Sequence, residues 1–219
     1  MTISRAAVRK CLPVMLMVSF AANADCDPKG VFRIVTVNMS PDIPKDSFAA
    51  KPKVAYRSGK YLARLEEAPD PANGMHLLFV INAPDAWTVN LLDKTGDHMV
   101  DKAESKDVHM LVFDPDPALG IPDEFSAIEF ACEREFFASH DAVLVPLKSE
   151  RRAMTKHQVS KGEWRITMIT EVGSDIPWAL MLAKSDRVIS AIRYISYLSR
   201  PDIDAALFAK PEGIKFVEH

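Results

Sequence analysis

The chain has 219 residues, of which 48% are hydrophobic and 26% are charged, with 8 glycines and 15 prolines. This composition is typical of a globular protein and excludes a disordered or fibrous one. The scarcity of glycine argues against the glycine-rich phosphate-binding turns of nucleotide-binding folds. The length fits one domain.

The first 24 residues have the pattern of a secretory signal peptide. Three basic residues lie among the first ten, an apolar run follows over residues 12–22, and Ala22-Asn23-Ala24 has the form of a cleavage site. The alternative, an uncleaved membrane helix, is disfavoured because the apolar run is too short to span a bilayer. We therefore expect a periplasmic protein whose single domain covers residues 25–219.

Removal of this leader makes the protein more acidic. The chain has 27 basic and 30 acidic residues, so the loss of three basic residues leaves 24 against 30, a net charge of −6. An acidic surface repels phosphate backbones, and no stripe of Lys and Arg with interleaved aromatic residues follows in the sequence. We expect no nucleic-acid partner, no stable membrane insertion after cleavage, and a monomer.

Two cysteines, Cys26 and Cys132, remain after the leader with Cys11 is removed. An exported protein folds in an oxidising space, where two cysteines favour one disulfide. Two unpaired buried thiols are the alternative. A bond would close a loop of more than 100 residues, for which the loop-entropy model gives roughly 4–5 kcal/mol of stabilisation.

The first part of the exported chain has the pattern of an antiparallel meander. Short turns containing Gly, Pro or Asp separate segments that are rich in β-branched and aromatic residues. Consecutive strands with such short connections pair antiparallel. The expected strands are residues 32–39, two strands within 53–67 about Ser58-Gly59, 75–82, 87–93, 98–101 and 108–113.

The apolar period then changes to three or four residues, which predicts one amphipathic helix over residues 124–139 with Asp123 as its N-cap. We expect the apolar positions of this helix to face the sheet and its acidic positions to face solvent. The inward set is Phe125, Ile128, Cys132 and Phe136, and the outward set is Glu124, Glu129, Glu133 and Arg134 or Glu135.

Strands resume after the helix, at residues 143–147, 164–171 and 178–183, with a last short one at 214–217. Residues 187–198 fit either a helix or a strand, and their β-branched and tyrosine content favours a strand. A short helical turn over 201–209, capped by Asp202, is expected before the final strand. Together these elements predict a mainly β fold with a helical insertion (α+β), in which a curved antiparallel sheet or incomplete barrel packs on a central helix.

Two segments resemble periplasmic lipoprotein-carrier (LolA/LolB-like) proteins. Residues 54–66, with the sequence VAYRSGKYLARLE, look like the second hairpin of that family. Residues 194–197 and 204–213, the latter DAALFAKPEG, are similar to its closing strand, turn and LF-x-x-P-x-G pattern. The resemblance is to an uncharacterised exported branch of the family, and it implies an incomplete barrel wrapped around helices, with an apolar cavity.

Members of this family carry lipoprotein acyl chains between membranes, accept them at the outer membrane, or sense envelope stress. The chain departs from the carriers in three ways. It has one expected central helix in place of several lid helices, it has an expected disulfide, and its segment 129–137 matches no carrier motif.

Apolar strand and helix residues are the candidates for lining a ligand cavity. In the absence of a ligand the same residues would form an ordinary filled core, and the sequence pattern is the same for both. The candidates are Phe79, Ile81, Trp87, Val89, Leu91, Phe113, Phe125, Ile128 and Phe136.

No motif for metal binding or catalysis emerges from the sequence. Glu133 and His140 share a helix face, but no His-x₃-His or Cys-x₂-Cys pair accompanies them. A Gly-x-Ser-x-Gly elbow is absent, and the adjacent Glu66 and Glu67 point to opposite faces of a strand. We expect no cofactor, no metal and no enzyme activity.

The function predicted from these patterns is that of an exported binding protein, which holds an acyl chain or a lipidated partner in the concave face of its sheet. The first alternative is an envelope interaction, assembly or stress-sensing module without a small ligand. The second is a hydrolase whose catalytic residues are dispersed along the chain.

Overall fold

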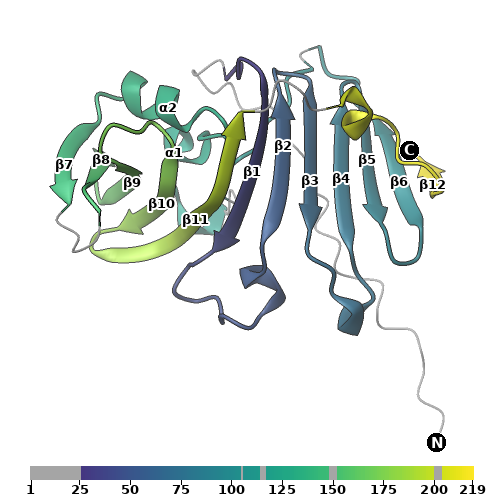
Figure 1. Ribbon diagram of the computed structural model, residues 1–219, viewed down its shortest axis with the longest axis horizontal. Coiled ribbons are helices and arrows are strands. Elements are labelled where there is room, and N and C mark those ends of the chain that lie inside the picture. The colour runs from purple at the N-terminus through teal and green to yellow at the C-terminus, as the bar shows by residue number, and fades with distance from the viewer. Residues whose placement is uncertain (1–25, 105, 114–116, 148–151, 200–203) are drawn as a thin grey trace, which may run out of the picture.

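The computed structural model describes residues 26–104, 106–113, 117–147, 152–199 and 204–219. The expected leader and the expected cap Asp202 lie outside the described residues. A single curved sheet of 12 strands dominates the structure, in the order β12-β6-β5-β4-β3-β2-β1-β11-β10-β9-β8-β7 (Figure 1). The predicted mainly β fold with a curved, unclosed sheet and a helical insertion is therefore confirmed.

The first half of the sheet is the predicted meander. Each of its strands pairs antiparallel with the next, and Gly59 has a positive φ of 55° in the tight turn between the second and third strands. Two 3₁₀ turns, η1 (Phe48–Ala50) and η2 (Pro71–Asn73), lie in its longer connections. The strands are β1 (Val31–Asn38), β2 (Lys53–Ser58), β3 (Leu62–Glu67), β4 (Leu77–Asn82), β5 (Asp85–Asn90) and β6 (Thr95–Val100).

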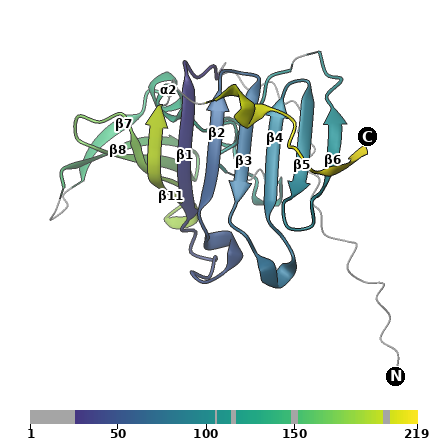
Figure 2. The same ribbon diagram turned by 45° about the vertical axis from the view of Figure 1, so that its right-hand side comes forward.

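The second half is another antiparallel meander, which joins the first where its last strand pairs with β1 (Figures 1 and 2). Residues 187–198, which fitted either a helix or a strand, lie in the long last strand. The strand over residues 154–161 was not predicted, because its sequence MTKHQVSK lacks alternating apolar positions. The strands are β7 (Val143–Leu147), β8 (Met154–Lys161), β9 (Trp164–Glu171), β10 (Pro177–Lys184) and β11 (Arg187–Ser199).

The predicted single helix over residues 124–139 is wrong. The segment between the two halves, which we call the insert (residues 108–113 and 117–140), contains a 3₁₀ turn and two short helices instead. A backbone bridge interrupts the expected helix. In this bridge Val112 N–H donates to Ile128 C=O and Phe130 N–H donates to Met110 C=O, each at 2.9 Å. The short elements are η3 (Pro117–Leu119), α1 (Asp123–Ser126) and α2 (Glu133–Ser139).

This bridge also replaces the predicted strand over residues 108–113. Leu111 pairs with Glu129 as an isolated antiparallel bridge rather than as part of the sheet. Ala131 then adopts a positive φ of 70°, which prevents a continuous helix from forming across the join between α1 and α2.

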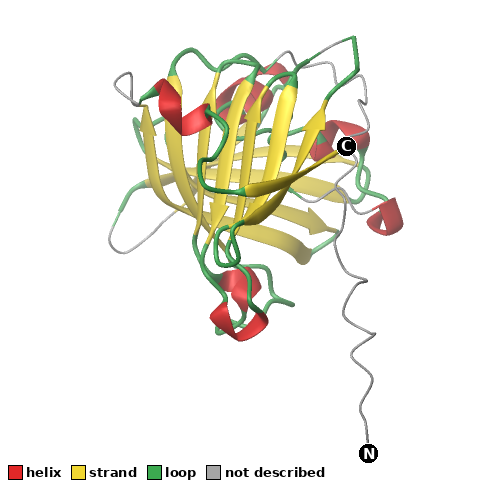
Figure 3. Ribbon diagram, turned by 90° about the vertical axis from the view of Figure 1, so that its right-hand side faces the viewer, coloured by secondary structure: helices red, strands yellow, loops and turns green. Residues whose placement is uncertain are grey.

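The two faces of the sheet are covered by different parts of the chain. Cross-strand partners share a face and neighbours along a strand alternate, so we call the face that carries Ile34, Ala55 and Leu180, against α1 and α2, the inner face. Figures 1 and 3 show the C-terminal segment on the other side of the first meander. This segment consists of η4 (Ala205–Phe208) and β12 (Lys215–Glu218), which pairs parallel with β6.

The outer face of β4 and β5 forms its own small core under the C-terminal segment. Gly96 allows this close packing, because a Cβ there would lie 2.6 Å from the Thr88 carbonyl oxygen and 3.1 Å from the Phe216 ring. Each large apolar side chain buried in this way stabilises the fold by roughly 1.5–3 kcal/mol. The members of this outer cluster are Leu78, Val80, Trp87 and Val89, with Leu91, Ile214 and Phe216 packed against them.

Candidate functional site

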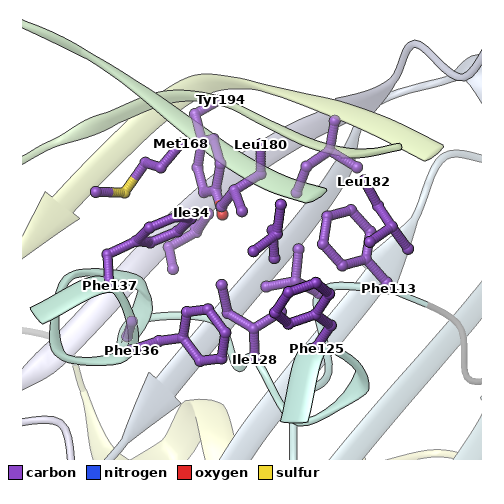
Figure 4. Close-up of a cluster of buried hydrophobic side chains, with 14 of the residues drawn as sticks. Ile34, Phe113, Phe125, Ile128, Phe136, Phe137, Met168, Leu180, Leu182 and Tyr194 are labelled. Atoms are coloured by element: carbon purple, nitrogen blue, oxygen red, sulfur yellow. The ribbon is translucent and has the colours of Figure 1, made fainter. Parts of the chain in front are cut away.

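The inner face of the second half of the sheet is a filled core. Side chains of the insert point from α1 and α2 into the curve of the sheet, where they meet side chains of β1, β9, β10 and β11 (Figure 4). The insert contributes five large side chains to this inner cluster, and each of them is at most 4% exposed. The residues that meet there are Phe113, Phe125, Ile128, Phe136 and Phe137 from the insert and Ile34, Met168, Leu180, Leu182 and Tyr194 from the sheet.

The nine residues predicted to line a cavity do not share one surface. Four of them, Phe113, Phe125, Ile128 and Phe136, belong to the inner cluster. Another three, Trp87, Val89 and Leu91, belong to the outer cluster on the opposite face. The remaining two, Phe79 and Ile81, are half-buried on the inner face of β4 and, among the described residues, join none of the buried apolar clusters.

Phe79 and Ile81 form part of a longer apolar surface on the inner face of the first meander. The cross-strand pairs Leu65–Phe79, Ile81–Ala86 and Ala86–Met99 place five apolar side chains on this face. Met99 is 41% exposed, and Leu65 at the other end packs against the inner cluster. We call these five residues the inner strip, which is continuous with the inner cluster and reaches solvent at β6.

A buried ion pair holds the insert against β2. Arg57, on the inner face of β2, has Nη1 2.6 Å from Glu129 Oε2, and both side chains are at most 4% exposed. The same guanidinium donates hydrogen bonds to the backbone carbonyls of Phe130 and Val108, both at 3.0 Å. The expectation that Glu129 faces solvent is therefore wrong, because the break between α1 and α2 turns this carboxylate toward the sheet.

Glu129 also contacts the imidazole of His109, whose Nδ1 lies 2.8 Å from Glu129 Oε1. This hydrogen bond to a carboxylate raises the pKa of His109 above its ordinary value. Arg57 and His109 thus approach one carboxylate from β2 and from the insert.

A second carboxyl group, that of Glu133, is almost fully buried at the start of α2. Its Oε1 accepts a hydrogen bond of 2.7 Å from the Tyr194 hydroxyl, and its Oε2 accepts one of 3.2 Å from Tyr197. Burial raises the pKa of Glu133 to about 7, and burial also raises the pKa of both tyrosines. His140, expected on the same helix face, instead stacks on the Phe136 ring.

The disulfide between Cys26 and Cys132 is present, as the sequence predicted, with 5.8 Å between the two Cα atoms. It ties the start of the described chain to the residue just before Glu133. We call the disulfide, the Arg57–Glu129 pair and the Glu133–tyrosine group the clasp, because all three attach the insert to the rest of the protein.

The sequence patterns did not identify Arg57, and they considered Glu133 only as a possible metal ligand on a solvent-facing side of the helix. The solvent-facing position is wrong, because Glu133 is buried. A signal for Arg57 was present, because alternation along β2 places it on the same face as Ala55, where a charged side chain needs a partner. No local signal marks Glu133, because its partners lie more than 60 residues away on β11.

A further polar group lies on the outer face. His98 stacks on Trp87 with 5.4 Å between ring centroids, its Nε2 lies 2.7 Å from Asp85 Oδ1, and its Nδ1 contacts Glu218 of β12. These two hydrogen bonds raise the pKa of His98 above its ordinary value. The group joins the C-terminal strand to the edge of the meander.

Within the described ranges, no cluster of three or more His, Cys, Asp or Glu side chains has an arrangement that could hold a metal ion. None of the helices in the described part of the chain has the length and hydrophobicity needed to cross a membrane.

Comparison with known proteins gives little further information. No family model matches the chain, and no curated protein matches it. Among solved structures, an uncharacterized conserved protein from Thermus thermophilus is similar with a TM-score of 0.47 and 11% sequence identity, over 87% of this chain and 91% of that chain.

Proposed function

We propose that this protein is an exported binding protein that holds an apolar ligand, such as an acyl chain, along the inner strip. The observation that carries the proposal is the unequal covering of the sheet. The C-terminal segment covers the outer face of the first meander, and α1 and α2 fill the inner face of the second. The inner strip, on the inner face of the first meander, stays partly exposed, most of all at Met99.

The side chains of the strip come from neighbouring strands, so an extended hydrocarbon can lie across them. Such a ligand needs no polar group to hold it there. Burial of about ten methylenes gains roughly 8 kcal/mol at about 0.8 kcal/mol for each group. A surface of Phe79, Ile81 and Met99 supplies apolar contacts of this kind, and at Leu65 this surface meets the inner cluster. The other seven residues first considered as cavity lining are assigned to packing.

Titration with a fluorescent fatty acid tests the proposal. Met99→Lys places a charge on the inner strip, and Leu92→Lys is the matched control because Leu92 is similarly exposed but lies in the turn between β5 and β6. We expect the Met99 variant to bind the probe at least about tenfold more weakly than the wild type, because the ligand would bury an unpaired charge, and we expect the Leu92 variant to bind it unchanged. Absence of probe binding by the wild type, or equal effects of both substitutions, contradicts the proposal.

The exposed edge of β7 supports the alternative of an interaction module. β7 ends the sheet, and Val143, Leu144 and Val145 are all exposed on it. Apolar edge strands pair readily with strands of other chains. Under this alternative, Val145→Lys abolishes association with a protein partner, whereas Met99→Lys has no effect on it. Co-purification with each variant from the native periplasm distinguishes the two functions.

A further inference from the structure

The clasp contains a buried carboxyl group that, among the described residues, is paired with no cation. Glu133 is 1% exposed and lies beside the inner cluster, where its two oxygens meet the hydroxyl groups of Tyr194 and Tyr197. Glu129, four residues earlier, differs because its carboxylate is paired with the guanidinium of Arg57. Burial without a cation disfavours the ionised form of Glu133 more strongly than the hydrogen bonds from the two tyrosines and from the backbone N–H groups of Ala131 and Glu133 favour it, so the net effect raises the pKa of Glu133.

The position of Glu133 couples this charge to a structural element. It is the first residue of α2, and Phe136 and Phe137 of the same helix bury their rings in the inner cluster. Any movement that brings Glu133 to water therefore withdraws the start of α2 from β11. On the other side of Glu133, the disulfide at Cys132 keeps the insert attached to residue 26.

We propose that Glu133 is a pH-sensitive latch, which holds α2 against β11 when its carboxyl group is protonated and releases the start of α2 when it is ionised. The disulfide and the Arg57–Glu129 pair limit the release, so that the insert loosens without separating from the sheet. The latch acts on the cover of the inner face, and it does not depend on which ligand or partner that face binds.

The neighbouring titratable groups come from three parts of the chain. β11 contributes two tyrosines that stay neutral, because burial raises the pKa of both. β2 contributes one guanidinium, which is already paired with the carboxylate of Glu129. The insert contributes one imidazole, two further carboxylates and one further guanidinium. These groups are Tyr194 and Tyr197 on β11, Arg57 on β2, and His109, Glu129, Arg134 and Glu135 on the insert.

The direction of the effect follows from the pKa of Glu133 in the two states. In the closed state burial raises the pKa to about 7, and in water the ordinary value is 4.5. The free energy that favours the closed state of α2 is therefore largest below about pH 4.5, decreases as the pH rises toward about 7, and is constant at higher pH. His109 changes in the same direction, since its pKa is also raised, so the wild type must be compared with a variant that removes the Glu133 charge alone.

Hydrogen exchange of the α2 amides between about pH 5 and about pH 8, corrected for the intrinsic pH dependence of exchange, tests the latch. The variant Glu133→Gln keeps a neutral group of the same shape, and Glu135→Gln on the exposed side of α2 is the matched control. We expect α2 protection to fall at least about tenfold with pH in the wild type and in the Glu135 variant. In the Glu133 variant we expect protection that changes much less.

An equal loss of protection with pH in the wild type and in Glu133→Gln overturns the proposal. If the glutamine variant does not fold, the ¹³C carboxyl resonance of Glu133 in the wild type decides. Ionisation near the ordinary value of glutamate excludes the latch, whereas a raised midpoint that coincides with the loss of α2 protection supports it. Because neither measurement uses a ligand, failure of the latch is distinguishable from failure of acyl-chain binding.

Discussion

The guanidinium of Arg57 on β2 and the carboxylate of Glu129 in the insert lie 2.6 Å apart in the interior of the protein. This pair holds the break between α1 and α2 in place, because Arg57 also donates hydrogen bonds to the backbone carbonyl of Phe130 within the break and to that of Val108 at the start of the insert. A buried ion pair that loses one partner leaves an uncompensated charge. The stability of the insert therefore depends on a contact between segments far apart in the sequence.

Glu129→Ala is expected to lower the free energy of unfolding by about 3–5 kcal/mol, because it leaves the Arg57 charge buried without its partner. Urea denaturation measures the change. The control is Glu135→Ala, which removes an exposed carboxylate from α2 and is expected to cost less than about 0.5 kcal/mol. Similar small effects of both substitutions show that Glu129 faces solvent in solution, contrary to the structure.

Phe136→Ala is expected to lower the free energy of unfolding by about 3–5 kcal/mol, as other truncations of large core residues do. Phe136 is 4% exposed and packs edge-on against Phe125 and Phe137. Thermal or urea unfolding measures the loss. Tyr61→Ala is the comparison, because Tyr61 is an aromatic residue that is 54% exposed. A loss at Phe136 no larger than that at Tyr61 excludes α2 from the core.

Replacement of Cys26 and Cys132 together by serine is expected to lower the free energy of unfolding by roughly 4–5 kcal/mol. The two cysteines are 106 positions apart, so the bond restricts much of the unfolded chain. The far-ultraviolet circular dichroism of the double variant should stay that of a folded β protein, because both meanders have cores of their own. Peptide mapping under non-reducing conditions that finds two free thiols in the wild type refutes the bond.

The contact between β12 and β6 is expected to weaken as the pH rises. The hydrogen bonds of His98 to Asp85 and Glu218 raise its pKa above 6.5. The stabilisation they give is complete below pH 6.5 and is lost as the pH rises through the raised value. Proton NMR of the His98 ring measures the midpoint, and exchange of the β12 amides reports the consequence. If the β12 amides of a His98→Gln variant show the same pH dependence as those of the wild type, His98 is not the cause.

Much of the strand pattern was predictable because it depends on local chemistry. The meander from β1 to β6 follows from alternating apolar residues and short polar turns, and residues 187–199 form a strand as their β-branched content indicated. β8 was missed because its side chains lack that alternation. The predicted helix failed because backbone bonds from Val112 and Phe130 to distant partners replaced helical ones.

The candidate site was predictable only in part. Periodicity correctly marked Phe125, Ile128 and Phe136 as inward-facing, since one side of each short helix still packs on the sheet. It did not show that Phe79 and Trp87 lie on opposite faces, because this depends on the register that pairs Phe79 with Thr88 and Val80 with Trp87. It also could not show which face is covered, because this depends on where the C-terminal segment folds back. The separation into an inner strip and an outer cluster is therefore a tertiary property.

The sequence by itself determined the fold class and the positions of most strands, and it favoured the pairing of Cys26 with Cys132, because alternation, turn chemistry and cysteine number are local or compositional signals. Only the tertiary structure decided which charged groups are buried. Glu129 and Glu133 look like ordinary solvent-facing positions of a helix, and they are buried because Arg57, Tyr194 and Tyr197 meet them from remote strands. The cost of burying a carboxyl group is set by such partners, and their positions depend on how the two halves of the sheet fold together.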